Sequence, residues 1–457
     1  MKRPDININT FDRIYFLGIG GIGMSALARY FKSRGWIVAG YDKTPSPLTE
    51  ALITEGIDIH FDDLGPSVPE GFKNKEATLV IYTPAIPVNL GERLHFEHNK
   101  FTMLKRAEVL GIITRESKAL GVAGTHGKTT TSTMLAHVLN ESSQKCSAFL
   151  GGISSNFNSN FITHPDAHIT VIEADEFDRS FLQLDPYASI ITTTDADHLD
   201  IYGNQDDFLE GFRQYAALIN PLGVLVKHQS VPLEHKNAVS YGIDSKTDYS
   251  ATNLRYVDGK FLMDLTTPDG FWESVELGIP GIHNAENAIA NIALCEHLGL
   301  SEIEIRNGLK TFKGVKRRFE YQIKTDDIVY IDDYAHHPTE IKALVSSIRL
   351  LYPDKKITGI FQPHLYSRTR DFFEGFSTEL SKLDEVILLP IYAAREEPIS
   401  GVSSEALLDK ITQSNKQLMQ PSEVVEKLSN RSEGVFLTIG AGDIDRIVHN
   451  IKTALES

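Results

Sequence analysis

The sequence predicts an α/β chain of about three domains, built from doubly wound parallel sheets. The chain has 457 residues, and at roughly 150 residues per domain this length favours about three domains. Apolar runs of strand length alternate with helix-like segments almost throughout, which is typical of α/β proteins. These runs are nearly continuous in apolar residues, as expected for parallel strands that are buried on both faces.

The elements of this pattern begin close to the N-terminus. Residues 13–17 are predicted to form a strand, and residues 23–34 a helix with one apolar face. The polar segment 231–281 contains short alternating runs, which predict an antiparallel appendage to the middle domain. Further strands are expected at residues 36–41, 77–82, 119–123, 169–172 and 189–193.

Two changes in local character predict the domain boundaries. A charged stretch at residues 114–118 precedes a new strand, loop and helix, so the first domain is expected to end near residue 112. The segment 314–318 separates a helix-like stretch from a new series of strands. The predicted domains are therefore residues 1–112, 113–313 and 314–457.

Composition excludes several classes of protein. Hydrophobic residues make up 41 % and charged residues 23 %, as in ordinary globular proteins, which excludes a disordered, collagenous or coiled-coil chain. Asp and Glu (61) exceed Lys and Arg (45), giving a net charge of −16. Because no basic run is present, nucleic-acid binding is disfavoured.

Location is predicted from apolar runs and cysteines. No apolar stretch approaches the roughly 18 residues of a membrane span, so no membrane association is expected. Cys146 and Cys295 form neither a CxxC motif nor a disulfide framework, and a cytoplasmic location is predicted. The oligomeric state cannot be predicted from this sequence.

A first glycine-rich loop follows the first predicted strand. Residues 18–23 read GIGGIG, a match to GxGxxG between a predicted strand and a predicted helix. Asp42 ends the next strand. Glycines there allow a diphosphate to approach a helix N-terminus closely. The alternative is a loop that only lets helix and strand pack together. The motif does not reveal whose diphosphate is bound.

A second glycine-rich loop is the stronger signal. Residues 124–130 read GTHGKTT after the strand 119–123, and a helix follows. Backbone N–H groups of such a loop cradle phosphates, with Lys128 reaching the β- and γ-phosphates and the Thr129 hydroxyl binding Mg²⁺. The usual spacing places glycine where this chain has Val122, so the loop is a shortened variant. The alternative is a chance GKT sequence. We predict that the chain consumes ATP.

Acidic residues follow two later strands. Glu173 and Asp175 come after the strand 169–172, where many ATPases place a carboxylate that holds Mg²⁺. Asp195, Asp197, His198 and Asp200 follow the strand 189–193, also at the carboxyl end where catalytic groups gather. The alternative is that they cap helices or lie in solvated turns. The two glycine loops together predict a nucleotide-diphosphate substrate in one domain and ATP in another.

The motifs resemble those of the Mur ligase family of peptidoglycan precursor synthesis, over essentially the whole chain. The resemblance is closest to the branch that joins L-alanine to UDP-N-acetylmuramate. Besides the first loop, the motifs are GTHGKTT at 124–130, EADE at 173–176, DADHLD at 195–200, GIHNAEN at 281–287, RRFE at 317–320, DDYAHHPTE at 332–340, FQPHLYSRTRD at 361–371 and YAAREEP at 392–398.

The resemblance implies a fold and a reaction. It implies an N-terminal Rossmann-like domain for the UDP-sugar, a central P-loop ATPase-like domain, and a C-terminal Rossmann-like domain for the amino acid. The first loop would then hold the uridine diphosphate of the substrate and not a dinucleotide cofactor. The implied reaction is ATP-dependent ligation of L-alanine to the carboxylate of UDP-N-acetylmuramate through an acyl phosphate, with Mg²⁺.

The resemblance also assigns roles to individual residues. Lys128, His198 and Arg370 are the expected catalytic residues, and Thr129, Glu173 and His198 are the expected metal ligands. The expected UDP-sugar contacts are Gly18, Gly20, Gly21, Ile22, Gly23 and Asp42. The expected ATP contacts are Gly124, Thr125, His126, Gly127, Lys128, Thr129, Thr130, His283, Asn284, Asn287, Arg318 and Asp332. The expected amino-acid contacts are Tyr334, His336, His364, Arg368 and Arg370.

Some of these residues have a simpler structural alternative. His198 is alternatively a hydrogen-bonded core histidine, and Asn284 an N-cap of the helix that follows it. Arg368 and Arg370 are alternatively surface ion-pair residues, although a guanidinium matches the carboxylate of alanine well. The pair His336 and His337 invites a zinc site, but adjacent side chains point in different directions and rarely bind one ion.

Alternative functions remain within and outside the family. A murein-recycling ligase would attach a whole tripeptide to the same UDP-sugar. A dinucleotide-dependent oxidoreductase would use the first loop alone, and a regulatory ATP-binding switch would not ligate at all. Leu365 and Phe177 depart from residues common in the family. No lysine lies between His198 and Lys227, which fits the alanine-adding branch, because several relatives that add later residues have a carbamylated lysine there.

Overall fold

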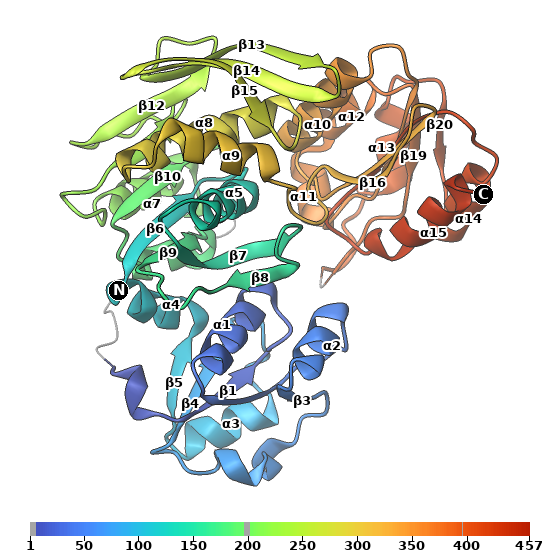
Figure 1. The fold of residues 1–457 in the computed structure, drawn as a ribbon. Coiled ribbons are helices and arrows are strands. Elements are labelled where there is room, and N and C mark those ends of the chain that lie inside the picture. Colours follow the sequence, from blue (N-terminus) through green and yellow to red (C-terminus); the bar gives the residue numbers. More distant parts are fainter. Residues whose placement is uncertain (1–5, 196–201, 395) are drawn as a thin grey trace. The chain divides into compact units, whose positions relative to one another are not determined.

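The structure is a computed structural model that describes residues 6–195, 202–394 and 396–457 (Figure 1). The chain forms two compact units. The first consists of Met1–Asn253, Met263–Leu277 and Glu286–Lys313, and it contains both glycine-rich loops. The second consists of Leu254–Leu262, Gly278–Ala285 and Gly314–Ser457.

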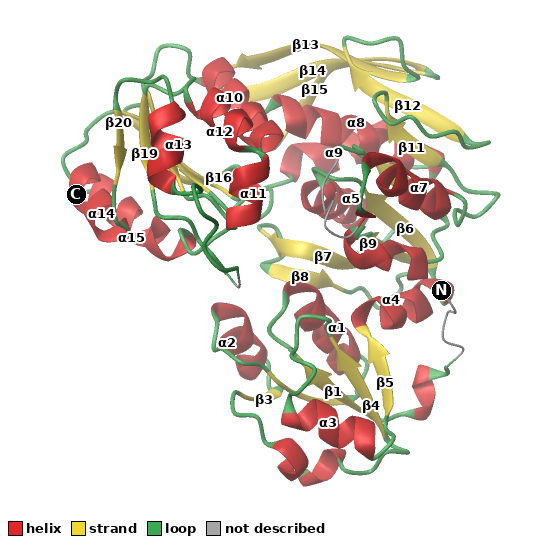
Figure 2. Ribbon diagram, turned by 180° about the vertical axis from the view of Figure 1, so that it is seen from behind, coloured by secondary structure: helices red, strands yellow, loops and turns green. Residues whose placement is uncertain are grey.

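The N-terminal sheet is wholly parallel and has five strands in the order β3-β2-β1-β4-β5. Helices α1 and α3 cover opposite faces of this sheet (Figure 2). Along β1, Ile14 and Phe16 belong to one apolar core, and Tyr15 and Leu17 to the other. The prediction of strands buried on both faces is therefore confirmed here. The elements are η1 (Ile8–Thr10), β1 (Arg13–Leu17), α1 (Ile22–Ser33), β2 (Ile37–Tyr41), α2 (Pro47–Thr54), β3 (Asp58–His60), η2 (Gly65–Ser67), η3 (Glu70–Phe72), β4 (Thr78–Tyr82), α3 (Gly91–His98), β5 (Thr102–Lys105) and α4 (Arg106–Arg115).

The central sheet has ten strands in the order β15-β14-β13-β12-β11-β10-β6-β9-β7-β8. The second glycine loop follows strand β6, and the acidic segment that begins at Asp195 follows strand β10. These two strands are parallel neighbours. The strands are β6 (Lys118–Ala123), β7 (Cys146–Ser154), β8 (Ser159–Ile162), β9 (Ile169–Glu173), β10 (Ala188–Ile191), β11 (Leu225–His228), β12 (Ala238–Ile243), β13 (Tyr249–Val257), β14 (Lys260–Thr267) and β15 (Gly270–Leu277). The helices are α5 (Lys128–Glu141), η4 (Phe177–Gln183), α7 (Gln205–Ala216), α8 (Ile282–His297) and α9 (Glu302–Thr311).

The predicted appendage is only partly antiparallel. Strands β14 and β15 are sheet neighbours joined by two residues, a connection that permits only antiparallel pairing. Strand β12, in contrast, pairs in parallel with both β11 and β13. The alternating pattern therefore predicted the hairpin but not the parallel strands that continue the central sheet.

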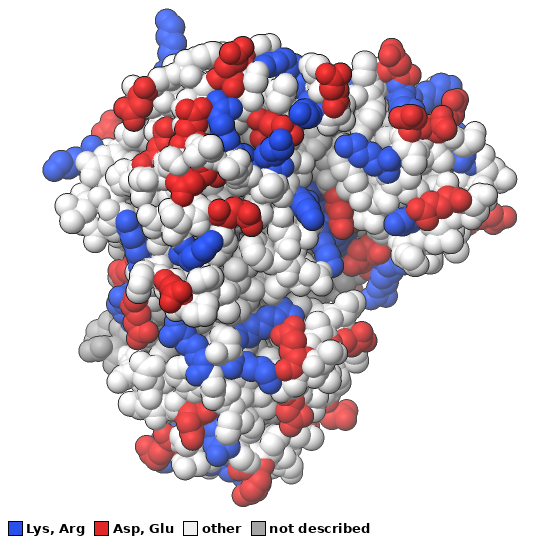
Figure 3. Space-filling model, viewed as in Figure 1, with Lys and Arg blue, Asp and Glu red and all other residues white. Residues whose placement is uncertain are grey.

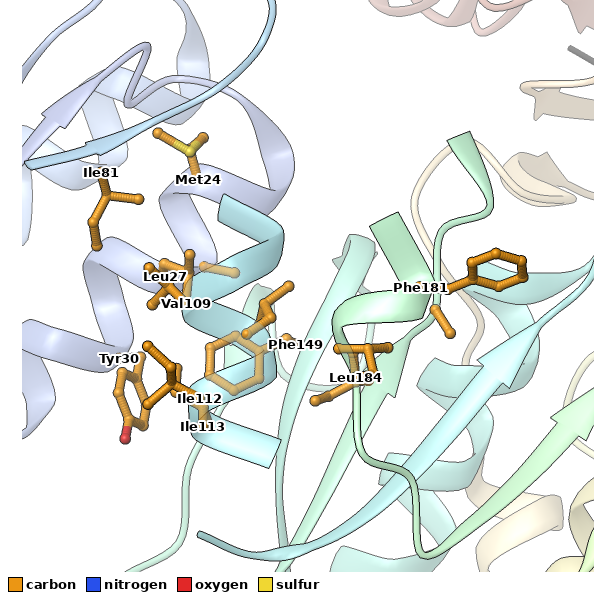
Figure 4. Close-up of a cluster of buried hydrophobic side chains, with 14 of the residues drawn as sticks. Met24, Leu27, Tyr30, Ile81, Val109, Ile112, Ile113, Phe149, Phe181 and Leu184 are labelled. Atoms are coloured by element: carbon orange, nitrogen blue, oxygen red, sulfur yellow. The ribbon is translucent and has the colours of Figure 1, made fainter. Parts of the chain in front are cut away.

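Helix α1, which follows the first glycine loop, packs against the central sheet. Tyr30 of α1 lies beside Phe149 of β7, with ring centroids 5.4 Å apart, and Ile112 and Ile113 of α4 join the same cluster (Figure 4). Asn160 of β8 donates hydrogen bonds to the carbonyl of Ile22 and to the hydroxyl of Ser25. One core therefore holds the first glycine loop against the edge of the ATPase-like sheet.

The C-terminal sheet has six strands in the order β16-β17-β21-β18-β19-β20, of which only β16 is antiparallel to its neighbour. Tyr330, Ile360 and Phe436 lie in its core. The strands are β16 (Glu320–Lys324), β17 (Ile328–Asp333), β18 (Ile357–Phe361), β19 (Glu385–Leu388), β20 (Lys416–Leu418) and β21 (Gly434–Ile439). The helices are α10 (Pro338–Leu351), α11 (Tyr366–Asp371), α12 (Phe373–Leu380), α13 (Ser404–Lys410), α14 (Pro421–Leu428) and α15 (Asp445–Leu455).

Surface charge and cysteines can be compared with the sequence expectations. Acidic and basic side chains are interspersed on the face shown in Figure 3. Cys146 and Cys295 are both buried and free. In the part of the chain that the structure describes, no helix is both long and apolar enough to cross a membrane.

Candidate active site

The second glycine loop has a backbone that requires glycine at two positions. Gly124 has a φ of +126°, and a Cβ placed on it would lie 2.1 Å from the hydroxyl oxygen of Thr192. Gly127, at the N-cap of α5, has a φ of +81°. Such angles strain any residue with a Cβ. Thr125 and His126 donate their backbone N–H groups to Thr193, which fastens the loop to the end of β10.

The ammonium group of Lys128 contacts both this loop and the carboxylate of Glu176. It lies 2.7 Å from each carboxylate oxygen of Glu176, and it donates to the carbonyl of Gly124 at 2.6 Å. Glu176 is only 1 % exposed. Burial raises the pKa of Glu176 to about 7, although Lys128 acts in the opposite direction. Burial alone would lower the pKa of Lys128, but the carboxylates of Glu176, Asp175 and Glu173 outweigh it and raise that pKa.

Two of the three expected metal ligands lie in the described part of the chain. Thr129 is nearly buried in the first turn of α5, and Glu173 ends β9 with its carboxylate accepting from the backbone of Gly151. Both supply the oxygen donors that Mg²⁺ prefers. Among the described residues, no group of three or more His, Cys, Asp or Glu is arranged to hold a metal. A hydroxyl and one carboxylate still fit Mg²⁺, because this ion keeps several of its waters. His198, with Asp197 and Asp200, lies outside the described residues.

The first glycine loop is shaped by Asp42. Its carboxylate accepts from the backbone N–H of Gly20 at 2.7 Å, and a Cβ on Gly20 would lie within 2.8 Å of that carboxylate. Gly18 has a φ of +86° and donates its backbone N–H to the carbonyl of Tyr41. Gly21 is the N-cap of α1, and Ile22 and Gly23 form its first turn. The loop therefore presents a glycine backbone at the start of α1, and the Asp42 carboxylate fixes its conformation through the hydrogen bond from Gly20.

A cavity of about 270 Å³ extends from this loop to the carboxylate of Glu173. One wall consists of Gly21, Ile22 and Gly23. The lining also includes Glu173 and Asp175, which come from the central domain. The groups expected to bind the UDP-sugar and the ATP-bound metal therefore border one continuous space.

The three ATP contacts expected from the GIHNAEN motif, His283, Asn284 and Asn287, lie in different surroundings. In the first unit, Asn287 accepts from the hydroxyl of Thr131 at 2.9 Å, and a Cβ on Gly127 would lie 2.8 Å from its side-chain oxygen. Asn287 is thus beside the phosphate loop. In the second unit, Asn284 is buried and donates to the carbonyl of Pro280 at 2.7 Å. His283 lies near Phe319, with ring centroids 6.1 Å apart.

In the second unit, the expected ATP contact Asp332 pairs with Arg317, a residue that was not among the expected contacts. Asp332 is 1 % exposed, lies 3.3 Å from Arg317, and accepts from the hydroxyl of Thr438. Burial raises the pKa of Asp332. Arg318 lies over the ring of Tyr334 at 4.8 Å. Arg318 also forms an ion pair with Glu340 at 3.8 Å.

The expected amino-acid contacts form one cluster, apart from Arg370. The ring of His336 lies 5.3 Å from that of Tyr334 and 6.4 Å from that of His364. Burial, aided by the positive charges of Arg368 and Arg318 and opposed by Glu340, lowers the pKa of His336 to about 4. Burial and Arg368 also lower the pKa of His364.

Arg370 and His337 lie outside the cluster around His336. The side chain of Arg370 is 55 % exposed and pairs with the neighbouring Asp371 at 2.7 Å. His337 accepts from the backbone of Thr339 at the start of α10, and its ring packs on Phe372. The two adjacent histidines therefore have separate surroundings, as the argument against a shared zinc ion predicts.

Sequence reasoning missed three charged residues of these clusters. Glu176 stands inside the EADE motif, which offered a signal, but its pairing with Lys128 depends on the turn that follows. Arg317 stands beside the predicted Arg318 in the RRFE motif. Arg106 belongs to no recognised motif, and it reaches the cavity from α4.

Comparison with known proteins decides the family. Sequence models described as "Mur ligase family, catalytic domain", "Mur ligase middle domain" and "Mur ligase, glutamate ligase domain" match residues 13–118, 122–295 and 317–445 in turn. The chain belongs to the Mur ligase family. As in other Mur ligases, ATP is therefore a substrate, and the predicted three-domain α/β fold is confirmed.

Individual relatives cover the chain almost end to end. The UDP-N-acetylmuramate–L-alanine ligase of Phocaeicola vulgatus is 48 % identical over 453 residues, which cover 98 % of each chain. That of Porphyromonas gingivalis is 47 % identical over 452 residues, covering 97 % of this chain and 99 % of the relative. Among solved structures, the UDP-N-acetylmuramate-alanine ligase MurC of Thermotoga maritima matches with a TM-score of 0.84 and 28 % identity over 97 % of this chain and 99 % of that one.

A second solved structure shares the fold. It is a murein peptide ligase from Psychrobacter arcticus, which matches with a TM-score of 0.66 at 21 % identity, covering 97 % of this chain and 98 % of that one. The family's overall arrangement of elements is therefore common to Mur ligases that differ widely in sequence from this one.

Proposed function

We propose that this Mur ligase joins L-alanine to the carboxylate of UDP-N-acetylmuramate, with conversion of ATP to ADP and phosphate, in peptidoglycan precursor synthesis. The observation that carries this proposal is the 48 % identity, over 98 % of both chains, to a curated UDP-N-acetylmuramate–L-alanine ligase. The murein-recycling alternative has weaker support, because two solved murein peptide ligases that match are 21 % and 25 % identical.

The chemistry explains why ATP is required. A free carboxylate is a poor acyl donor because its leaving group would be oxide. A carboxylate oxygen attacks the γ-phosphorus, ADP leaves, and an acyl phosphate forms. The nitrogen of alanine then attacks the acyl carbon, the bond from that carbon to the phosphate oxygen breaks, and phosphate departs. The nitrogen loses its protons along this path.

Lys128 and the loop around it would serve the first step. Two anions, the carboxylate and the γ-phosphate, must approach each other there, so positive charge has to be concentrated at that point. Lys128 is held charged among three carboxylates by the contacts described above. The γ-phosphate would replace Glu176 as its partner, with Gly124–Thr130 cradling the phosphates.

A bound Mg²⁺ would be held by Thr129 and Glu173, with His198 as the further expected ligand. When bound, this ion neutralises phosphate charge and so favours attack by an anionic carboxylate. The protein's own part is to hold these oxygen donors at the end of β9 and in the first turn of α5.

The amino acid would bind at the cluster around His336. His336 donates from Nδ1 to the carbonyl of Tyr334 at 3.0 Å, and a ring with a pKa of about 4 is neutral at pH 7. Its Nε2 is then a hydrogen-bond acceptor, suited to an amine. Arg368 would hold the carboxylate of alanine, and Tyr334 and His364 would border it. Arg370, which lies outside this cluster, would join Arg368 only by giving up its contact with Asp371.

The proposal is tested by measuring phosphate release with Mg-ATP and UDP-N-acetylmuramate, with and without L-alanine. Release that requires both the UDP-sugar and L-alanine supports it. Release that requires the tripeptide in place of alanine would assign the protein to murein recycling, and release independent of the UDP-sugar would leave only an ATPase. We also propose a cytoplasmic location, which the two free cysteines favour.

A further inference from the structure

The cavity between the first glycine loop and Glu173 contains one feature that the proposed function does not use. Among the described residues that line it, Arg106 is the sole lysine or arginine, and the acidic residues of the lining are Glu173 and Asp175. An anionic substrate that enters this space meets two carboxylates and a single guanidinium. Without that guanidinium, every charged side chain in the lining would repel the substrate.

Arg106 has hydrogen-bonding capacity to spare. A guanidinium carries five N–H donors, and in the described part of the chain Arg106 uses one of them, from Nη2 to Asp175 at 3.3 Å. The side chain is 23 % exposed and that of Asp175 36 %. A long, single contact to a partly exposed carboxylate contributes little. The pair is therefore easily exchanged for a better acceptor.

The glycine loop is built to let Arg106 reach this place. A Cβ on Gly23 would lie 2.7 Å from Nη1 of Arg106 and 3.0 Å from its Cδ. The side chain of Arg106, from α4, therefore lies directly against the last glycine of GxGxxG, in the first turn of α1. Sequence reasoning assigned that glycine to phosphate approach or to helix packing alone.

We propose that Arg106 binds an oxyanion of the UDP-sugar in this cavity, exchanging Asp175 for the substrate. This inference rests on the proposed function. Two groups of the UDP-sugar share the required chemistry, the diphosphate and the carboxylate of the N-acetylmuramate. A guanidinium binds either with two parallel hydrogen bonds, and the experiment distinguishes them.

A second ion pair on the same helix provides a matched control. Arg115 of α4 also pairs with an acid of the central domain, Asp185, at 3.7 Å, with exposures of 35 % and 31 %. It does not line the cavity. If Arg106 only tied the two domains together, Arg106→Gln and Arg115→Gln would have similar effects.

The test is calorimetric titration of the wild type, Arg106→Gln, Arg106→Lys and Arg115→Gln with UDP-N-acetylmuramate, UDP, UDP-N-acetylglucosamine and ATP. We expect Arg106→Gln to weaken UDP-N-acetylmuramate binding about 30-fold, because the variant loses the charge-assisted hydrogen bonds to the substrate. ATP binding should stay within about twofold, and Arg106→Lys should be intermediate. Weaker binding of all three uridine ligands would assign Arg106 to the diphosphate. A loss confined to UDP-N-acetylmuramate would assign it to the carboxylate.

Two outcomes would overturn the inference. One is a change for the uridine ligands no larger in Arg106→Gln than in Arg115→Gln. The other is an equal loss of ATP and uridine-ligand affinity with a lower melting temperature, which would mean a structural role. A failure of the proposed function would be visible separately, as a wild-type protein that releases no phosphate in the presence of UDP-N-acetylmuramate and L-alanine.

Discussion

Replacing Lys128 by alanine should disable ligation and, separately, destabilise the protein in a pH-dependent way. The ammonium lies 2.7 Å from both oxygens of Glu176, which is 1 % exposed. Removing it leaves a buried carboxylate without its partner, a change that typically costs about 3–5 kcal/mol. We expect a loss of this size in the free energy of unfolding at pH 8, and a fall in ligation of about 10³-fold.

The pH dependence follows from the direction of the pKa shift. The folded pKa of Glu176 is raised from 4.5 to about 7, so its protonated form favours the folded state and stability is lost as the pH rises through that range. Without Lys128 the folded pKa rises further. The variant should then keep losing about 1.4 kcal/mol per pH unit above pH 7, while the wild type levels off.

Thermal unfolding of Lys128→Ala at pH 6 and pH 8 measures this effect. A double variant that combines Lys128→Ala with Glu176→Gln should recover most of the stability but none of the ligation. Equal stability of wild type and Lys128→Ala at both pH values would refute the reasoning about the buried pair. Retention of ligation within about tenfold would refute the role of Lys128, and loss of UDP-N-acetylmuramate binding would contradict two separate phosphate sites.

Two further predictions concern the amino-acid end and the phosphate loop. Arg368→Lys and Arg370→Lys should each raise the KM for L-alanine about tenfold at unchanged KM for ATP, because a lysine cannot form the planar pair of hydrogen bonds; an unchanged alanine KM removes that arginine from the site. Gly124→Ala should lower stability by about 2–4 kcal/mol and weaken ATP binding, because its Cβ would clash with a hydroxyl 2.1 Å away. Gly259→Ala, with φ +78° and no atom within 4 Å, should cost only about 1 kcal/mol. Similar melting temperatures for the two alanine variants would contradict the clash.

The parts of the fold that follow from local patterns were predictable. Continuous apolar runs identified parallel strands in the first sheet, because strands buried on both faces need no polar positions. The second glycine loop was predicted with its strand and helix, because its glycines meet a local backbone requirement. Strand β12 was not predicted to be parallel, since its direction depends on where the chain returns and not on its own residues.

The site was less predictable, because its contacts join distant or sharply turned segments. Arg106 meets Asp175 across 69 residues of sequence, which no local motif encodes. Asp332 pairs with Arg317, which was not among the predicted contacts. Arg317 and Phe319 have φ values of +61° and +50°, a local backbone that the RRFE motif does not reveal. Asp178, with a φ of +51°, turns the chain sharply just after Glu176.

The central claim is that the carboxylate of the UDP-sugar becomes an acyl phosphate before alanine attacks. Its most direct test uses UDP-N-acetylmuramate with ¹⁸O in the carboxylate, incubated with the enzyme, Mg-ATP and L-alanine. The acyl carbon–oxygen bond breaks when phosphate leaves, so mass spectrometry should find one ¹⁸O in each phosphate released. The sugar product should contain the new amide. Unlabelled phosphate, with or without amide formation, would contradict the account.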